Sequence, residues 1–292
     1  MLDIEDIKGS IQNQQLLDIQ RSVKFSYDAS GRLRYHTGGY AVIFPCEING
    51  EKKALRCWHT AIAGSDERYK EIAASFTRSG LFYLVEFEYH VQALTINGQR
   101  YPVMITKWTD GINIKDYVWE NRYNARLLST LSRRFLTMCA EMNGRQISHG
   151  DIQHGNIIIR RDGRPKLIDY DSVWTPEMGN GTPDIIKGLS AYQHPGRKEN
   201  KYGFNGIDFF AQLVVYLSIL AVIHNPSLSE KYHFADSEHM LFSAADYTDW
   251  QHSEVRDDLC RLHDEEIDYL VTMMDCYLEI ENITKLPSFY HY

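Results

Sequence analysis

The sequence contains few cysteines, and none of them are paired by spacing. Five cysteines are scattered along the 292 residues without C-x-x-C spacing: Cys46, Cys57, Cys139, Cys260 and Cys276. This pattern argues against a disulfide scaffold and against the common structural zinc motifs. We interpret them as reduced thiols that mostly pack as small hydrophobic side chains, and we expect a cytoplasmic protein.

Long apolar runs and an excess of positive charge are also missing. The most apolar run, Phe209 to Ile223, contains Gln212 and Ser218 and is too short to cross a bilayer, so we expect a buried helix. The 31 basic and 39 acidic residues give a net charge of −8. This balance argues against a protein that mainly binds nucleic acid or an anionic membrane. The N-terminus carries acids where a secretory signal is cationic. We therefore expect no nucleic-acid partner and no membrane partner.

The stretch from Ile147 to Asp171 has the pattern of a β-hairpin. An apolar run, Ile157–Ile159, is followed by Asp162-Gly163 and then by Leu167-Ile168. Two short apolar runs joined by Asp-Gly are typical of two strands and a tight turn. The sequence therefore predicts a hairpin here.

Polar side chains stand at the open end of this predicted hairpin. If the turn is centred between its Asp and its Gly, antiparallel pairing places Asn156 opposite Asp169. Directly opposed residues have Cβ atoms about 5 Å apart. An amide oxygen and a carboxylate at that spacing suit Mg²⁺, which takes its other oxygens from phosphate and water. Asp151, five residues before Asn156, is expected to reach a substrate hydroxyl beside the metal.

These residues resemble the catalytic elements of the protein kinase superfamily. The kinase pattern H-R-D-x-x-x-x-N corresponds to H-G-D-I-Q-H-G-N at 149–156, and D-F-G corresponds to D-Y-D at 169–171. The resemblance implies an α+β, bilobal protein kinase-like fold. Its N-lobe is a small antiparallel β-sheet with one main helix, and its C-lobe is larger and mostly helical.

The same resemblance gives the expected domain boundaries. Residues 1–32 form an N-terminal helical extension, because Ile4, Ile7 and Ile11 recur at loosely helical spacing. This extension caps the domain or docks a partner. The kinase-like N-lobe is expected at 33–107 and the C-lobe at 108–292.

Two segments of the N-lobe resemble nucleotide-binding elements. Residues 36–43 resemble the glycine-rich loop, whose backbone N–H groups contact phosphates, although a plain hairpin turn would use the same two glycines. Thr106 to Gly111 corresponds, by its position along the chain, to the kinase hinge whose backbone contacts adenine. The residues expected to bind the cofactor here are Gly38, Gly39, Tyr40, Ala41, Ile43, Lys107 and Trp108.

The lysine that pairs with the nucleotide phosphates in kinases is replaced here. Arg56 occupies its position, and the planar guanidinium of arginine is not interchangeable with an ammonium group. The acid that normally pairs with this lysine corresponds to Glu67 or Glu71, and Glu71 fits the spacing better. We expect Arg56 and Glu71 to belong to the cofactor site. The alternative is that Arg56 is an ordinary cation on a surface strand and Glu71 an ordinary acid on an exposed helix face.

The segments after the D-Y-D motif also follow the kinase order. Residues 172–198 form a long loop without periodicity that corresponds to an activation segment, with Y-Q-H-P at 192–195 near its end. Asp171 adds a metal-facing carboxylate or caps the following turn. Asp208 caps the buried helix, or it holds the catalytic-loop backbone as in kinases, and both roles are compatible.

The resemblance implies ATP and Mg²⁺ bound between two lobes, with Asn156 and Asp169 holding the metal as catalytic residues together with Asp151. Three hypotheses follow. The first is a Ser/Thr-type protein kinase that phosphorylates a protein hydroxyl. The second is a small-molecule kinase of the aminoglycoside or choline type, whose loop also lacks an arginine between His and Asp. The third is a pseudokinase or nucleotide-binding regulatory module, which Arg56 favours.

Overall fold

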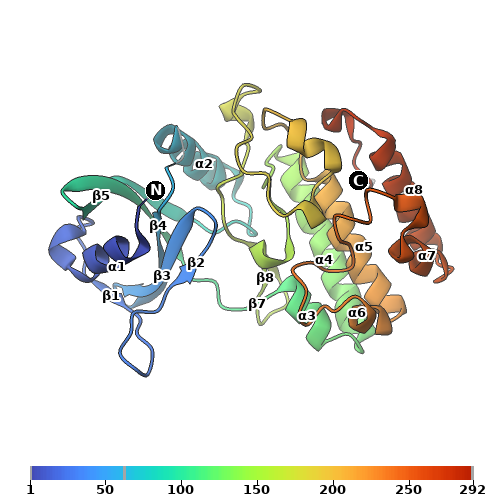
Figure 1. Ribbon diagram of the computed structural model, residues 1–292, viewed down its shortest axis with the longest axis horizontal. Coiled ribbons are helices and arrows are strands. Elements are labelled where there is room, and N and C mark those ends of the chain that lie inside the picture. Colours follow the sequence, from blue (N-terminus) through green and yellow to red (C-terminus); the bar gives the residue numbers. More distant parts are fainter. Residues whose placement is uncertain (1, 62–63, 291–292) are drawn as a thin grey trace. The chain divides into compact units, whose positions relative to one another are not determined.

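The computed structural model describes residues 2–61 and 64–290, which form two compact units. Unit 1 comprises Met1–Gly80 and Val85–Thr109, and unit 2 comprises Leu81–Leu84 and Asp110–Tyr292. Unit 1 is an antiparallel sheet with one long helix, and unit 2 is mostly helical (Figure 1). The α+β kinase-like fold expected from the sequence is therefore confirmed.

Unit 1 is built on an antiparallel sheet with the strand order β1-β3-β4-β6-β5, in which β2 also pairs with β3. Two of its turns are Asn-Gly pairs, at 49–50 and 97–98, and both residues of each turn have positive φ. This backbone geometry matches the twist of the strands that the turns join. The strands are β1 (Val23–Phe25), β2 (His36–Thr37), β3 (Ala41–Ile48), β4 (Glu51–Trp58), β5 (Phe87–Ile96) and β6 (Gln99–Lys107).

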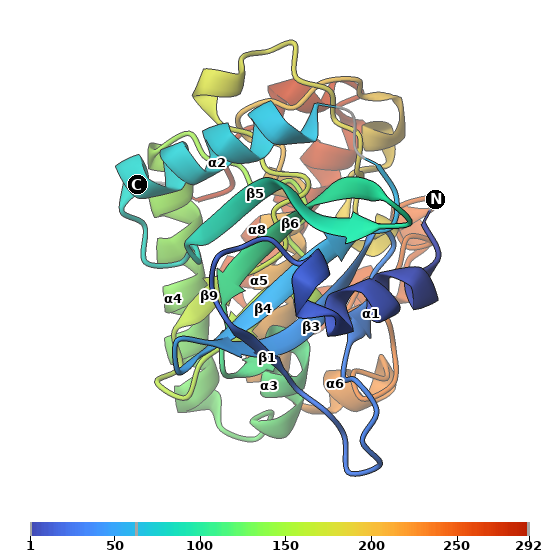
Figure 2. The same cartoon turned by 90° about the vertical axis from the view of Figure 1, so that its left-hand side faces the viewer.

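Two helices pack against this sheet. Helix α1 (Ile4–Gln12) lies across one face (Figure 2), and its Ile7 and Ile11 share a buried core with Leu55 and Cys57 of β4. Helix α2 (Ser65–Ser79) contacts β5 through the aromatic ring of Phe76, which meets Phe87 edge to face. The N-terminal helix is thus part of the core of unit 1.

Unit 2 is organised around α5 (Phe209–His224), which is buried along most of its length. Helix α4 (Ala125–Gly144) lies beside it (Figure 1). The buried helix predicted from the apolar run is confirmed. In the described part of the chain, no helix is long and apolar enough to cross a membrane. The other helices are α3 (Ile114–Glu120), α6 (Ser227–Lys231), α7 (Glu254–Cys260) and α8 (Glu265–Glu279), and the three-stranded sheet consists of β7 (Ile112–Asn113), β8 (Ile157–Ile159) and β9 (Pro165–Leu167).

A short segment between α2 and β5, Leu81–Leu84, belongs to unit 2. Leu84 forms a parallel bridge with Leu167 of β9, and the Leu167 N–H donates a 2.8 Å hydrogen bond to the carbonyl of Tyr83. The ammonium group of Lys166 also donates to the carbonyl of Phe82 and lies 4.0 Å from the centre of its ring. These contacts cover the free edge of β9.

Candidate active site

The hairpin predicted from the sequence is present as β8 and β9, but its register differs from the prediction by one residue. The strands pair Ile157 with Leu167, so the turn is centred on Asp162. Gly163 has φ +72° and donates its N–H to the carbonyl of Arg160 (2.8 Å). This is a three-residue loop that ends in a left-handed glycine, rather than a two-residue Asp-Gly turn.

The predicted pairing of Asn156 with Asp169 is therefore wrong. Asn156 faces Ile168, whose N–H donates to the Asn156 carbonyl (3.0 Å). Asp169 follows with φ +66°, a left-handed conformation that aspartate adopts more readily than most residues. Its backbone thus leaves the strand, and its negative charge acts on Asp151, where it helps to raise the pKa of that carboxyl. The two carboxylates therefore lie near one another despite the changed register.

Asn156 binds Asp151 directly. Its Nδ2 donates to the backbone carbonyl (2.9 Å) and to Oδ2 (2.8 Å) of Asp151. These two bonds engage the amide nitrogen and fix the orientation of the amide group, so Oδ1 of Asn156 faces away from Asp151. An amide oxygen and the carboxylate of Asp169 are the oxygen donors that Mg²⁺ prefers, so these residues fit such an ion.

A metal ion at this place would need further oxygens. Within residues 2–61 and 64–290, no group of three or more His, Cys, Asp or Glu side chains is arranged to hold a metal. Magnesium commonly takes one or two protein ligands and completes its shell with phosphate oxygens and water. The donor set of Asn156 and Asp169 therefore matches a metal that arrives together with a phosphate ligand.

Burial is the main influence on the carboxyl group of Asp151. It raises the pKa of this group, with the negative charge of Asp169 adding to the effect, while the hydrogen bond from Asn156 and the positive charge of Arg197 oppose it. Its Oδ1 is buried and has no hydrogen-bond partner among the described residues. The backbone of Gly188 packs against this oxygen so closely that a Cβ on Gly188 would overlap it.

The loop that carries Asp151 is held from below by Asp208. Its Oδ2 accepts from the His149 N–H (2.5 Å) and its Oδ1 accepts from the Gly150 N–H (2.8 Å). Its side chain makes no capping hydrogen bond to α5. Of the two roles predicted for Asp208, the structure therefore shows the one that holds the loop.

His149 is buried and has a structural role. Its Nδ1 accepts from the Asp151 N–H (3.3 Å), so Nε2 carries the ring hydrogen and donates to the carbonyl of Ile168 (3.0 Å). The ring also meets Tyr170 edge to face, with 6.0 Å between centroids. His149 thus joins the backbone of the loop that carries Asp151 to the segment that precedes Asp169.

Gly150 occupies a position where no other residue fits without rearrangement. Its φ is +78°, and a Cβ would overlap the carbonyl oxygen of Ser172. The close approach follows from a bridge in which Ser148 and Trp174 exchange backbone hydrogen bonds of 3.0 and 2.9 Å. The arginine that kinases carry at this position is therefore excluded by the backbone itself.

The glycine-rich candidate in unit 1 is a hairpin turn between β2 and β3. Thr37 pairs with Val42, and the Gly38 N–H donates to the carbonyl of Ala41 (2.9 Å). Gly39 and Tyr40 form the turn, and a Cβ on Gly39 would meet open space. The predicted residues thus share one turn and the first strand after it.

The remaining candidates of unit 1 lie on three different elements. Arg56 is buried in β4 opposite Ile43, with its guanidinium 5.7 Å from the centre of the Trp58 ring. Glu71 is on α2 and pairs with Arg78 at 2.8 Å. Two further candidates lie at the end of β6: Lys107 is its last residue, and Trp108, the next residue, donates its N–H to the carbonyl of Lys52 (3.1 Å).

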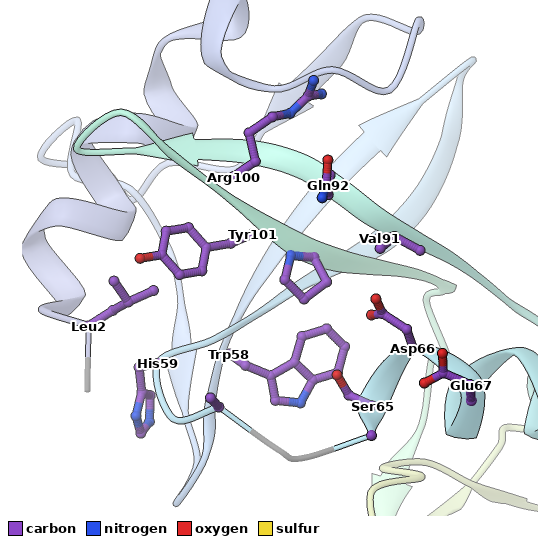
Figure 3. A pocket seen from close by; sticks show the side chains of 13 residues that line it. Leu2, Trp58, His59, Ser65, Asp66, Glu67, Val91, Gln92, Arg100 and Tyr101 are labelled. Atoms are coloured by element: carbon purple, nitrogen blue, oxygen red, sulfur yellow. The ribbon is translucent and has the colours of Figure 1, made fainter.

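A separate pocket in unit 1 has a volume of about 530 Å³ (Figure 3). Trp58, His59, Asp66 and Tyr101 are among the residues that line it. Of the residues that the sequence singled out, its lining includes Glu67, the alternative to Glu71 for the acid of the cofactor site. Its mixed donors and acceptors do not define a ligand class.

Sequence reasoning missed three buried residues of unit 2, of which Gln193 lies near Asp151. Asp184, Gln193 and Arg197 form a chain of hydrogen bonds, described below, within the segment that follows the D-Y-D motif. This segment has no periodicity, so nothing in the pattern marked these side chains as buried. The one available signal was the position of Arg197, directly after Y-Q-H-P-G.

A comparison with protein families agrees with this geometry. Residues 96–178 match the model of the ABC1 atypical kinase-like domain, which belongs to the protein kinase-like superfamily. The matched span includes the catalytic loop, the β8–β9 hairpin and the D-Y-D motif. No curated protein matches the chain. The resemblance to the protein kinase-like superfamily is therefore confirmed, on a family match that contains the catalytic-loop motif itself.

Proposed function

We propose that this chain is an ATP- and Mg²⁺-dependent phosphotransferase, specifically a Ser/Thr-type protein kinase that transfers the γ-phosphoryl group of ATP to a protein hydroxyl. The observation that carries the proposal is the contact between Asn156 and Asp151 beside Asp169, on a loop that Asp208 holds in place. It brings a proton acceptor next to two oxygen donors for a metal. Positioning and charge neutralisation are what phosphoryl transfer requires from a protein.

Each residue has a defined part in this proposal. Asn156 and Asp169 hold the metal, which neutralises charge on the phosphates when it is bound. Asp151 orients the acceptor hydroxyl and takes its proton. In unit 1, the turn at Gly38 and Gly39, with Tyr40, Ala41 and Ile43, supplies backbone contacts to the phosphates. Arg56 supplies positive charge to the phosphates, Glu71 of the same site pairs with Arg78 in this structure, and the backbone at Lys107 and Trp108 contacts adenine.

A nucleotide-binding module without transfer activity is the second candidate. It is favoured by Arg56, which is buried in β4 beside the ring of Trp58 and stands where kinases use lysine. A small-molecule kinase is the third candidate, favoured by the glycine that the backbone requires at position 150. These candidates differ in the acceptor and in the rate of transfer.

Two measurements test the proposal. The first is the thermal midpoint of the purified chain with ATP, with Mg²⁺ and with both; we expect the largest increase with both. The second is transfer of labelled phosphate to the chain itself, to serine and threonine peptides, and to a panel of small hydroxyl compounds. Asp151→Asn and Asp169→Ala are expected to abolish transfer, while Asp236→Asn, a change at an exposed aspartate of unit 2, is expected to leave it unchanged.

The outcomes separate the three candidates. Transfer to peptides that depends on Asp151 supports the protein kinase. Transfer to small hydroxyl compounds alone supports the small-molecule kinase. Binding of ATP and Mg²⁺ with equal background transfer in the wild type and in both variants supports the binding module. An absence of binding overturns the proposal.

A further inference from the structure

Three buried polar residues form a chain that leads toward Asp151. Asp184 accepts two hydrogen bonds from the guanidinium of Arg197, from Nε (3.2 Å) and from Nη2 (2.9 Å). Arg197 then donates from Nη1 to Oε1 of Gln193 (2.5 Å). Arg197 is 2% exposed and Gln193 is 7% exposed, so water cannot replace these partners. The chain fixes the position of Gln193.

This chain also fixes the direction of the Gln193 amide. A guanidinium has donors and no acceptor, so the amide must present its oxygen to Arg197. The amide nitrogen therefore points away from Arg197. Rotating the amide by half a turn would place the N–H₂ group of Gln193 against the N–H groups of Arg197, and leaving buried donors without an acceptor is unfavourable.

The amide nitrogen of Gln193 and Oδ1 of Asp151 face the same place. Both atoms are buried and have no hydrogen-bond partner among the described residues. A Cβ built on Gly188 would overlap Oδ1 of Asp151 and would lie 3.1 Å from Nε2 of Gln193. A donor and an acceptor thus flank one point next to Gly188, and each destabilises the folded chain while it lacks a partner.

We propose that Gln193 and Asp151 together bind the acceptor hydroxyl of the phosphoryl-transfer reaction. The inference rests on the proposed function and adds a positioning residue to it. Nε2 of Gln193 donates to the hydroxyl oxygen, and the hydroxyl donates its hydrogen to Oδ1 of Asp151. One O–H group satisfies both buried atoms, because it is a donor and an acceptor at once.

The reaction balances at this site. The hydroxyl oxygen forms a bond to the γ-phosphorus of ATP, its proton passes to Asp151, and the bond from that phosphorus to the β–γ bridging oxygen breaks to release ADP. Gln193 keeps its hydrogen bond to the attacking oxygen and directs that oxygen's lone pair. Because the backbone of Gly188 covers the point in this structure, the acceptor enters when the segment around Gly188 moves aside.

Gln193→Glu tests the inference with little change in shape. The glutamate keeps an oxygen for Arg197 but loses the N–H groups and adds a negative charge near Asp151. We expect transfer of labelled phosphate to serine and threonine peptides to fall at least about tenfold, which corresponds to about 1.4 kcal/mol in the barrier. The KM for ATP should stay unchanged, and the pH at which activity appears should rise.

Two other variants serve as controls. Gln212→Glu makes the same change at a buried glutamine of α5 that contacts Asn143 and Tyr290 and is not part of this chain. It is expected to keep wild-type transfer. If Gln193→Glu fails to fold, Gln193→Met removes the N–H groups without adding charge, and it should show the same loss of transfer with an unchanged thermal shift by ATP and Mg²⁺.

A readout without turnover separates this inference from the proposed function. The thermal shift of the chain by ATP and Mg²⁺ should be the same in the wild type, in Gln193→Glu and in Gln212→Glu, because Gln193 is proposed to bind the acceptor and not the nucleotide. Equal transfer rates in the wild type and the Gln193 variants would overturn the inference and leave the proposed function intact. A wild type that neither binds ATP with Mg²⁺ nor transfers phosphate would overturn both.

Discussion

Oδ1 of Asp208 accepts a 2.8 Å hydrogen bond from the backbone N–H of Gly150, at the start of the loop that carries Asp151. The other carboxylate oxygen accepts from His149, so both oxygens are engaged by backbone donors. Burial raises the pKa of this carboxyl, while these two bonds and the charge of Arg197 act in the opposite direction. A buried charge of this kind is tolerated because its partners are fixed.

We predict that Asp208→Asn destabilises the chain by about 2–4 kcal/mol, although it removes a buried charge. An amide has one acceptor oxygen, so one backbone N–H would face an N–H₂ group. Thermal and urea denaturation of the variant should show midpoints below those of the wild type. Asp236→Asn, at an exposed site, is the control. Unchanged midpoints in Asp208→Asn would mean that the loop does not depend on this carboxylate.

Asp151→Asn is expected to have the opposite effect on stability. Burial raises the pKa of the Asp151 carboxyl, and one of its oxygens has no partner among the described residues, so its charge is a cost to the folded state. Removing the charge should raise the free energy of unfolding by about 1 kcal/mol near pH 7.

The gain should depend on pH in a defined direction. A carboxyl with a raised folded pKa costs stability when the pH is above that pKa, and it costs nothing when the pH is below the unfolded value of 3.8. The stabilisation by Asp151→Asn should therefore shrink as the pH falls toward 3.8. Urea denaturation at several pH values checks this, and a gain that is independent of pH would contradict the explanation.

Gly150→Ala should destabilise the chain more than the loss of a left-handed glycine alone explains. The added Cβ would overlap the carbonyl of Ser172 in addition to straining φ. Gly80→Ala is the control: its φ of +62° is left-handed, but a Cβ there has no atom within 4 Å in the described structure. We expect a cost of about 1 kcal/mol at Gly80 and more than about 3 kcal/mol at Gly150, measured by denaturation. Equal costs would show that the Ser172 backbone moves aside.

The stability of unit 2 should decrease as the pH is lowered, because of His154. Its Nδ1 accepts a 2.8 Å hydrogen bond from the hydroxyl of Tyr192, and burial lowers the pKa of His154 from 6.5 to about 4. As the pH falls below 6.5, His154 is protonated in the unfolded chain, whereas in the folded chain it is protonated only near pH 4. A shift of this size corresponds to about 3 kcal/mol of stability that is lost between these two pH values.

His154→Gln tests this explanation by removing the titrating group. The variant should lose less stability than the wild type between pH 6.5 and pH 4, measured as the change in the free energy of unfolding. His263→Gln, at an exposed histidine, should behave like the wild type. Parallel pH dependence in the wild type and in His154→Gln would assign the loss to other groups.

The elements of the fold that depend on local pattern could be predicted from the sequence. The apolar run from Phe209 predicted α5, and two Asn-Gly pairs predicted turns with positive φ. The register of the β8–β9 hairpin could not be predicted, because an Asp-Gly pair suits both a two-residue turn and the three-residue loop that is present. A shift of one residue was enough to change the partner of Asn156.

The candidate site was predictable where it depends on spacing, and hidden where it depends on tertiary packing. Asp151 and Asn156 lie five residues apart on one loop, so their contact follows from the motif. Asp208 had two possible roles, and the sequence could not choose between a helix cap and a support for the loop. The chain from Asp184 through Arg197 to Gln193 joins residues of an aperiodic segment, so its burial gave no sequence signal.

The segment Leu81–Leu84 has a consequence for how this protein can be divided. It lies between two elements of unit 1 in the sequence, yet its backbone bonds to β9 of unit 2. A fragment that ends at Thr109 would contain these four residues but not Leu167, their partner. A fragment that starts at Asp110 would lack them, and the edge of β9 would be exposed. No single cut yields both halves intact, so recombinant halves should be made with this four-residue segment supplied to the second one, or the chain should be kept whole.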